Sequence, residues 1–376
     1  MDAAEAVPHL DELYLWSMQM TPTRALVSVI IPTYNRAHCL ARAVESALTQ
    51  TYPNVEVIVV DDGSTDTTGD LIVRQYGKDR RVMYLYQANS GVCAARNAGF
   101  ERARGDYIAL LDSDDVWEPW KLELQIACLE KHPEIGMVWT DMTAIGRDGT
   151  TVISRAYMRQ MYSAYRWYTN ETLFSARHTL DGITPAVASL IPGASLWTGD
   201  IFSQIIVGNL VTTPTVVLTR KRLAAVGGFD QDLAESGEDH DFHLRTCREG
   251  AVGFVDVSST RVQRGRDDQL SSKQLPLARN YLITVSRALA RDRERITLPQ
   301  NRIDGVMAHA HRWIGEALLA EGLRKSEARK HLYQSLSWAI DRRTLFAIAL
   351  SFVPASLRNI VRVMRRRMRE SFATRM

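Results

Sequence analysis

Acidic side chains gather at three places in this 376-residue sequence, and each cluster could do a different kind of chemistry. Carboxylates can accept hydrogen bonds from a ligand, coordinate hard cations or take up protons. In chain order the clusters are Asp61-Asp62, Asp112-Ser113-Asp114-Asp115 and Glu238-Asp239-His240-Asp241.

The second cluster predicts a divalent metal site. On an extended segment alternate side chains point the same way, so Asp112 and Asp114 would face one site together. Oxygen ligands with no His or Cys nearby suit Mg²⁺ or Mn²⁺, bound through one or two carboxylates and diphosphate oxygens. The sequence has no Gly-x-x-x-x-Gly-Lys loop, so this metal would neutralise most of a bound diphosphate's charge. An Asp-x-Asp pair also occurs by chance, and its place at a strand end makes it informative.

The third cluster predicts a general base. It follows Gly237 and opens an expected helix over residues 238–249, whose N-terminus keeps the Asp239 carboxylate ionised and able to take a proton. Helix capping is the alternative, and it explains one acid more easily than four polar residues in a row. His240 and His243 lack the four-residue spacing of a helical metal pair, so we expect surface or packing roles for both.

The first cluster ends an expected strand, and Gly63 provides a turn that exposes it. A carboxylate there could accept a hydrogen bond from a base imino group or a ribose hydroxyl. An Asx-turn or a helix cap is the alternative interpretation, and the residues alone leave both open.

These clusters are positioned by a repeated unit of a short apolar run, a turn and an amphipathic helix. Strands are expected over residues 27–32, 55–60, 82–86, 106–111 and 136–139. Helices are expected from about residues 40 and 66, over 91–104 with Ser90 as N-cap, and over 118–131. The alternation predicts an α/β fold with a mostly parallel sheet and helices on both faces, with ligands bound beyond the carboxyl ends of the strands.

The pattern changes after residue 141. Residues 142–208 show weak periodicity and many aromatic side chains, which could stack on sugar rings but are favoured as core. A strand is expected over 213–219 and a helix over 221–226. Beyond residue 275 the sequence is helical, and the pair at about 303–321 and 326–340 resembles a single helix-turn-helix repeat.

Six motifs in this order resemble glycosyltransferase family 2, whose members have the GT-A fold. The resemblance is dense from about residue 25 to 138 and resumes from about 209 to 272. The motifs are Val27-Ser-Val-Ile-Ile-Pro-Thr-Tyr-Asn35, Val60-Asp-Asp-Gly-Ser-Thr-Asp66, Asn89-Ser-Gly with Ala95-Arg-Asn-Ala-Gly99, Leu111-Asp-Ser-Asp-Asp115, Gly227-Gly-Phe-Asp230 and Gly237-Glu-Asp-His-Asp241.

The resemblance implies an inverting, metal-dependent glycosyltransferase that moves a sugar from a nucleotide-sugar, expected to be a UDP-sugar, to an acceptor hydroxyl. Its expected setting is bacterial-type polysaccharide or glycoconjugate biosynthesis, with a glycan or lipid-linked acceptor. Tyr34 would lie on the nucleobase and Asp62 would bind its edge. By their positions in the motifs, the residues implied in donor binding are Pro32, Tyr34, Asn35, Asp62, Arg96, Asp112 and Ser113. Asp114 would bind the Mg²⁺ or Mn²⁺ ion, and Asp239 would be the general base. Secondary candidates are Asp61, Glu238, Asp241, Arg264 and Arg266.

One stretch departs from the family pattern. Many members carry a His near residues 260–272 that helps to hold the metal and diphosphate, whereas this sequence has Gln263, Arg264 and Arg266 there. An arginine can neutralise phosphate in a bidentate way, so activity is still expected, but the residue that replaces the His stays open.

The domain organisation expected from these patterns has four parts. They are an N-terminal extension (1–24), a GT-A domain (25–272), a helical region (273–343) and a basic amphipathic tail (344–376). Within the GT-A domain we expect a nucleotide-binding half (25–140), an insertion (141–208) and an acceptor and base half (209–272).

Two other functions compete with this interpretation. A nucleotidyltransferase would need a Gly-rich loop bearing Lys or Arg after the first strand, and residues 32–36 are not such a loop. A non-catalytic nucleotide-sugar-binding protein would have no use for Asp239.

Composition and charge suggest where the protein acts. Four separated cysteines without metal-type spacing indicate reduced thiols in a cytoplasmic protein, and neither a secretory signal nor a spanning apolar run is expected. Residues 355–376 contain seven Arg and one Glu, so this segment has a formal charge of +6. The whole chain has a formal charge of +3, so the remaining residues carry about −3. We expect this tail to lie peripherally on an anionic membrane surface, with a solvated terminal helix as the alternative. Nucleic acid is disfavoured because the arginines lack interleaved aromatic residues.

Overall fold

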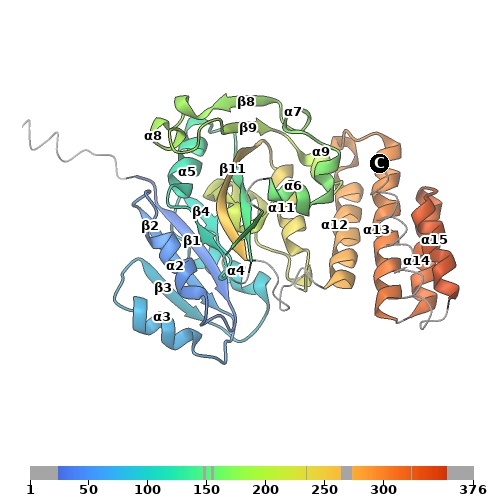
Figure 1. The fold of residues 1–376 in the computed structure, drawn as a ribbon, viewed down its shortest axis with the longest axis horizontal. Helices are drawn as coiled ribbons and strands as arrows, with labels where there is room; N and C mark the ends of the chain where they lie inside the picture. Colours follow the sequence, from blue (N-terminus) through green and yellow to red (C-terminus); the bar gives the residue numbers. More distant parts are fainter. Residues whose placement is uncertain are drawn as a thin grey trace, which may run out of the picture.

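The computed structural model describes residues 24–146, 150–153, 156–233, 235–263, 273–322 and 324–353, and its centre is an 11-stranded mixed sheet (Figure 1). Along its main path the strands follow the order β3-β2-β1-β4-β10-β6-β11-β9-β8, with β5 paired to β11 and β7 to β6. The strands are β1 (Val27–Thr33), β2 (Val55–Asp61), β3 (Val82–Tyr86), β4 (Tyr107–Leu110), β5 (Val116–Trp117), β6 (Met137–Ile145), β7 (Thr151–Ile153), β8 (Ala176–Thr179), β9 (Ser195–Gly199), β10 (Val217–Thr219) and β11 (Val252–Gln263).

The N-terminal half of the sheet is parallel, as the strand and helix alternation predicts. Strands β3, β2, β1 and β4 pair in parallel, and helices α2 (Leu40–Leu48), α3 (Thr68–Tyr76) and α4 (Val92–Arg102) connect them. Alternate residues of β1 face opposite layers: Ile30 packs in the same core cluster as Cys93 of α4, and Ile31 in the same cluster as Leu40 of α2. Because both faces are covered, these strands are apolar along almost their whole length.

The second half of the sheet is joined to the first by one short antiparallel strand. β10 pairs with β4 on one side and with β6 on the other, while β11 runs parallel to β6. The connecting helices are α5 (Lys121–Lys131), α10 (Arg220–Val226) and α11 (Glu238–Arg248). Only residues 217–219 of the strand expected over 213–219 form the ladder, because Thr213–Thr215, with Pro214 in the middle, is a 3-10 turn.

The segment with weak periodicity folds into short elements around β8 and β9. It contains α6 (Tyr157–Met161), α7 (Asn170–Leu173), α8 (Pro185–Ala188) and α9 (Phe202–Ile205). Tyr165 and Trp197 are buried, and the Tyr165 hydroxyl donates to the Leu210 carbonyl, whereas Trp167 is exposed. Two of these three aromatic side chains are therefore buried in the core, as favoured over stacking on sugar rings.

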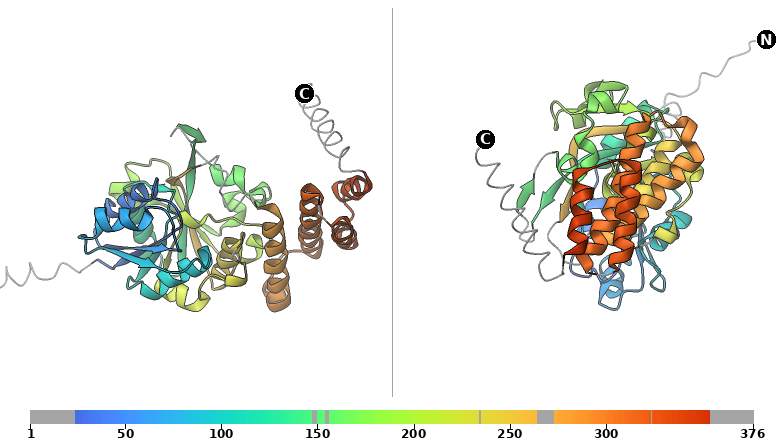
Figure 2. Two further views of the ribbon diagram at one scale, coloured as in Figure 1. Left: turned by 90° about the horizontal axis from the view of Figure 1, so that it is seen from below. Right: turned by 90° about the vertical axis from the view of Figure 1, so that its right-hand side faces the viewer.

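Four helices extend from the sheet at one end of the molecule, standing side by side (Figures 1 and 2). They are α12 (Gln274–Asp292), α13 (Gln300–Glu321), α14 (Lys325–Trp338) and α15 (Arg342–Phe352). Helix α12 packs on α11, and a separate apolar cluster that includes Ile314, Leu318 and Leu332 joins the outer helices. No helix in the described ranges combines the length and apolarity needed to cross a bilayer. The predicted α/β fold with a C-terminal helical extension is confirmed.

Two local predictions are wrong. Ser90 does not cap α4: Gly91 occupies the N-cap position with φ of 88°, and the Ser90 side chain bonds to the Ala88 carbonyl. Residues 112–114 are not extended either. They form a turn closed by a bond from the Asp115 amide to the Asp112 carbonyl, because the chain reverses between β4 and β5.

Candidate active site

A pocket of about 1370 Å³ opens where the carboxyl ends of β1, β2 and β4 meet the N-terminus of α11. It brings together residues from all three acidic clusters. The expected site residues that line it are Pro32, Tyr34, Asn35, Asp62, Arg96, Asp112, Ser113, Asp114, Glu238 and Asp239. Asp61 and Asp241 are not among its lining residues, and Arg264 and Arg266 lie outside the described residues.

Asp62 organises the loop that follows β3. Its carboxylate accepts hydrogen bonds from the Gln87 side chain at 2.7 Å, the Ser90 amide at 2.9 Å and the Gly91 amide at 2.8 Å. The neighbouring Asp61 is buried and bonds to the Ser64 amide and the Tyr84 hydroxyl. Asp61 therefore has the turn-forming role that the sequence left open, whereas Asp62 lines the pocket with its oxygens already engaged.

The loop after β1 presents Tyr34 to the pocket. Asn35 has a left-handed φ of 53°, and its side-chain oxygen accepts from the amides of Thr65 and Asp66 at 2.8 and 3.2 Å. An Asn tolerates this conformation better than most residues. The strained residue is thus held by the loop after β2, and the Tyr34 side chain remains 46% exposed beside it.

The second acidic cluster supplies only oxygen ligands. Asp112, Ser113 and Asp114 all line the pocket from the turn after β4. Within the described ranges, no group of three or more His, Cys, Asp or Glu side chains is arranged to hold a metal by itself. A set of one or two carboxylates still fits an ion that takes most of its other ligands from a diphosphate and water.

Arg96 links the two halves of the site. Its guanidinium donates to Asp112 Oδ1 and to Glu238 Oε1, both at 2.9 Å, and lies 4.8 Å from the centre of the Phe229 ring. Although burial opposes the charge, the two carboxylates raise the pKa of Arg96. Arg96 is therefore held between a carboxylate of the second acidic cluster and one of the third, a position that its motif alone does not predict.

The Gly-Gly-Phe motif supports this arginine from behind. Gly228 lies against α4, and a Cβ there would be 2.4 Å from the side-chain oxygen of Asn97. That oxygen accepts from the Phe229 amide, and the Asn97 side chain donates to the Phe229 carbonyl. Phe229 is thereby fixed beneath Arg96 and stacks on Phe242 of α11 at 4.2 Å.

Asp239 lies in the first turn of α11, where it lines the pocket. It is partly exposed at the pocket, and its two oxygens accept from the Asn209 side chain and the His240 amide at 2.9 and 2.8 Å. Burial raises the pKa of Asp239, while the bond from the His240 amide and the charge of Arg96 lower it and the charge of Asp112 raises it further. Burial likewise raises the pKa of Glu238, although Arg96 counteracts it. A carboxylate with a raised pKa is better matched to proton transfer near neutral pH.

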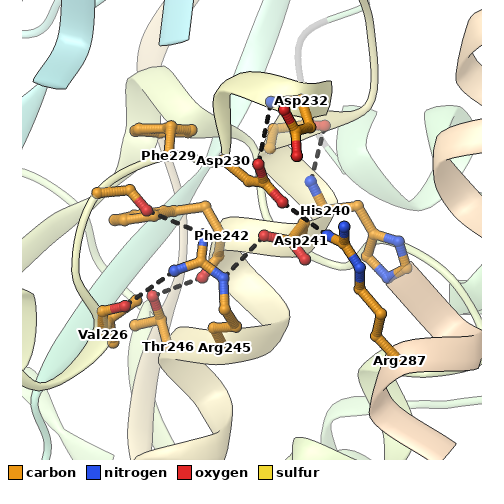
Figure 3. Close-up of polar contacts among 12 residues, drawn as sticks. Val226, Phe229, Asp230, Asp232, His240, Asp241, Phe242, Arg245, Thr246 and Arg287 are labelled. Atoms are coloured by element: carbon orange, nitrogen blue, oxygen red, sulfur yellow. Dashed lines mark hydrogen bonds and ion pairs between the residues drawn. The ribbon is translucent and has the colours of Figure 1, made fainter. Parts of the chain in front are cut away.

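Asp241 belongs to a separate network of polar contacts that includes Arg245 (Figure 3). It accepts a hydrogen bond from Arg245 at 2.8 Å, and Arg245 also donates to the carbonyls of Val226 and Gly228. The pairing stabilises the connection between α10 and α11. Among the three acids of the cluster, the geometry brings Glu238 and Asp239 to the pocket and leaves Asp241 outside it.

His240 and His243 are packing residues, one of the two roles expected. His240 stacks on Tyr281 at 5.4 Å and bonds to the Ile205 carbonyl. Burial lowers the pKa of His243 to about 3, and its Nε2 lies 3.2 Å from the Thr213 hydroxyl. Both are therefore neutral near pH 7.

Several pocket residues carry no sequence signal. Asn209 orients Asp239 from a loop that has no motif. The wall contributed by α12 and α13 contains Leu277, Tyr281, His309, Trp313 and Glu316, which sequence reasoning assigned only to amphipathic helices. At the departure from the family pattern Gln263 lines the pocket and accepts from Arg42 at 3.4 Å.

Comparison with known proteins agrees with the resemblance seen in the motifs. Residues 28–185 match the family model described as Glycosyl transferase family 2. An uncharacterised glycosyltransferase of Rickettsia felis is 31% identical over 237 residues, 63% of this chain and 33% of that protein. Chondroitin synthase of Escherichia coli is 41% identical over 138 residues, 37% of this chain and 20% of that protein. This chain therefore spans a third or less of the length of either relative.

The fold has a counterpart among solved structures. The mannosyltransferase PcManGT from Pyrobaculum calidifontis, in complex with GDP-Man and Mn²⁺, superposes with a TM-score of 0.51 at 17% identity. The similarity covers 90% of this chain and 86% of that one. At this identity the similarity shows the fold, and the GT-A prediction is confirmed at that level.

Proposed function

Starting from the family 2 match over residues 28–185, we propose that this protein is an inverting glycosyltransferase that moves a sugar from a nucleotide-sugar to an acceptor hydroxyl. The observation that carries the proposal is the position of Asp239. Its pKa is raised, it lies at the N-terminus of α11, and it shares one pocket with the donor-side residues Tyr34, Asp62 and Asp112.

On the donor side, Tyr34 stacks on the nucleobase and Asp62 binds its edge. The exposure of Tyr34 in the pocket supports the first role. The three bonds to Asp62 suggest that it also shapes the loop of residues 87–91 around the base. In this proposal the base is uracil. PcManGT has a similar fold but holds GDP-Man, a guanine nucleotide, so the fold does not determine which base is bound. The loops around the base must therefore select it.

Asp114, with Asp112 as a second carboxylate, would hold a divalent cation, Mg²⁺ or Mn²⁺, in the donor site. When bound, such an ion supplies positive charge to the diphosphate leaving group. The oxygen-only character of these side chains fits either ion. Ser113 contributes a hydroxyl and Pro32 and Asn35 contribute the wall on which the nucleotide rests.

In the transfer step Asp239 takes the proton of the acceptor hydroxyl. The acceptor oxygen then bonds to the anomeric carbon as the bond from that carbon to the diphosphate oxygen breaks, and attack from the opposite face inverts the centre. Asn209 holds the carboxylate in position, and Glu238 keeps Arg96 beside it. The polysaccharide setting is proposed from the similarity to a chondroitin synthase.

The test compares Asp239→Asn with Asp241→Asn, the same change two residues along one helix but outside the pocket. Asp239→Asn should keep UDP binding and lose about 10²–10⁴-fold in UDP-sugar hydrolysis and transfer, the usual cost of removing a general base. Asp241→Asn should retain wild-type turnover. Near-normal turnover of Asp239→Asn, or its loss in Asp241→Asn at full folding, would assign the base elsewhere.

A further inference from the structure

The pocket has a wall that the donor-binding residues do not use. Helices α12 and α13 contribute Leu277, Tyr281, His309, Trp313 and Glu316 to its lining. The pocket volume of about 1370 Å³ exceeds the range of about 300–1,000 Å³ that a single small ligand fills. The space therefore suits two ligands, with the donor beside β1, β2 and β4 and a second molecule beside the helices.

Three aromatic rings of this wall form one connected cluster. Trp313 stacks on His309 with ring centres 5.8 Å apart and an interplanar angle of 13°, and lies 5.9 Å from Tyr281. Two backbone carbonyls, those of Ile206 and Val207, accept hydrogen bonds from the Tyr281 hydroxyl at 3.2 and 3.0 Å. The cluster is thus rigidly held before any ligand arrives, which lowers the entropic cost of binding.

The cluster leads directly to the proposed base. Tyr281 stacks on His240, the residue next to Asp239, at 5.4 Å. Tyr281 is itself buried, whereas Trp313 and His309 are both partly exposed, so Trp313 offers the larger accessible ring of this cluster. A ligand on Trp313 would therefore lie on the side of Asp239 away from the nucleotide-binding loops.

The charges of the wall favour a polar ligand with one apolar face. Glu316 on α13 and Lys273 before α12 are both exposed at the pocket. Burial lowers the pKa of His309 to about 4, so the imidazole beside Trp313 is neutral near pH 7. A hydrocarbon chain would remove water from these charged groups at a cost in free energy. A sugar ring can place its C–H face on the indole and its hydroxyls near the carboxylate.

We propose that the α12–α13 wall is an acceptor subsite in which Trp313 stacks on a sugar ring of a glycan acceptor and Glu316 accepts from its hydroxyls. The inference rests on the proposed glycosyltransferase function and assigns the helical region a role in it. The ring bound by Trp313 belongs to the acceptor unit next to the one that presents its hydroxyl to Asp239.

The experiment measures saccharide binding by isothermal titration calorimetry in the presence of saturating UDP. The probes are maltose, cellobiose and N,N′-diacetylchitobiose, each titrated into wild type, Trp313→Phe, Trp313→Ala and Glu316→Gln. The matched control is Trp338→Ala, on α14 and outside the pocket lining. Thermal melting and UDP affinity of each variant report on folding and on the donor site.

At least one disaccharide should bind the wild type saturably, and Trp313→Ala should weaken it by about tenfold, a loss in keeping with an aromatic contact. Glu316→Gln, an exposed change that should spare the fold, should weaken the same saccharide, while Trp338→Ala should bind normally. UDP affinity should stay at the wild-type level in every variant, and the control Trp338→Ala should also keep wild-type UDP-sugar hydrolysis.

Equal saccharide affinity in Trp313→Ala, Glu316→Gln and wild type, or no binding of any probe to wild type, would overturn the subsite. If the wild type failed to bind UDP or to hydrolyse any UDP-sugar, the proposed function itself would be at fault. These readouts are separate, so a failed subsite with an intact donor site is recognisable.

Discussion

Replacing Arg96 with methionine should destabilise the protein in a strongly pH-dependent way. The guanidinium donates to Glu238, which is buried, and to Asp112, whose side chain is 34% exposed. Loss of the Asp112 contact should cost little free energy of unfolding, because water can solvate the exposed carboxylate, as for exposed ion pairs generally. Loss of the Glu238 contact leaves a buried carboxylate without its cation, a change that typically costs about 3–5 kcal/mol.

The variant can limit this cost by protonating Glu238. Starting from a reference Glu pKa of about 4.3, neutralising the carboxyl costs about 5 kcal/mol at pH 8 but only about 1 kcal/mol at pH 5. Burial already raises the pKa of Glu238, and removing Arg96, which lowers it, raises it further. A raised folded-state pKa means that stability is retained below the unfolded pKa and lost as pH rises, so the defect grows between pH 5 and pH 8.

Urea denaturation of wild type, Arg96→Met, Glu238→Gln and the double variant at both pH values measures this coupling. The single Arg96→Met change should cost about 3–5 kcal/mol at pH 8 and about 1 kcal/mol at pH 5. Adding Glu238→Gln should recover most of the pH 8 loss, since no charge is then left unpaired. Equal losses at both pH values without recovery would show that Arg96 acts through packing on Phe229 instead.

Three further predictions address the metal, the core and the tail. Asp114→Ala should raise the Mn²⁺ concentration for half-maximal UDP-sugar hydrolysis by more than about tenfold, and full turnover of wild type in excess chelator would contradict a metal role. Gly99→Ala should cost about 1–3 kcal/mol in urea denaturation, because the added Cβ would lie 2.4 Å from Ile30 Cγ2. The matched control Gly305→Ala, within α13 and with no atom within 4 Å of its Cβ, should gain about 0.5–1 kcal/mol. Deleting residues 354–376, which lie outside the described residues, should abolish sedimentation with anionic vesicles at low salt and leave UDP-sugar hydrolysis intact. The reason is that each basic residue near such a surface contributes about 1 kcal/mol of binding free energy. Full-length protein that does not sediment with those vesicles would refute the membrane role.

Hydrophobic periodicity in the sequence predicted the strands and helices of the N-terminal half of the fold. The apolar runs and amphipathic segments placed β1 to β4 and α2 to α5 within a few residues of their positions. Because parallel strands end at one edge, the same reasoning placed Asp62, Asp112 and Asp114 around one site.

Tertiary contacts could not be predicted in this way. No pattern in residues 217–219 indicates an antiparallel strand between β4 and β6, since three residues carry too little periodicity. Likewise, Trp313 reads as one apolar position of an amphipathic helix until α12 and α13 bring it to the pocket. The pairing of Arg96 with Glu238 joins residues 142 apart, and either partner alone could equally face a ligand.

The three-residue strand β10 has a consequence for the order of events during synthesis. Without it, β4 has no partner on its outer side and β6 has no route into the sheet. At about 5–20 residues per second, a ribosome needs roughly 5–20 s to travel from the end of β4 to the end of β10. Throughout that interval the nascent four-stranded sheet exposes an open edge to other chains, so chaperone dependence and aggregation yield should respond more to changes at β10 than its small size suggests.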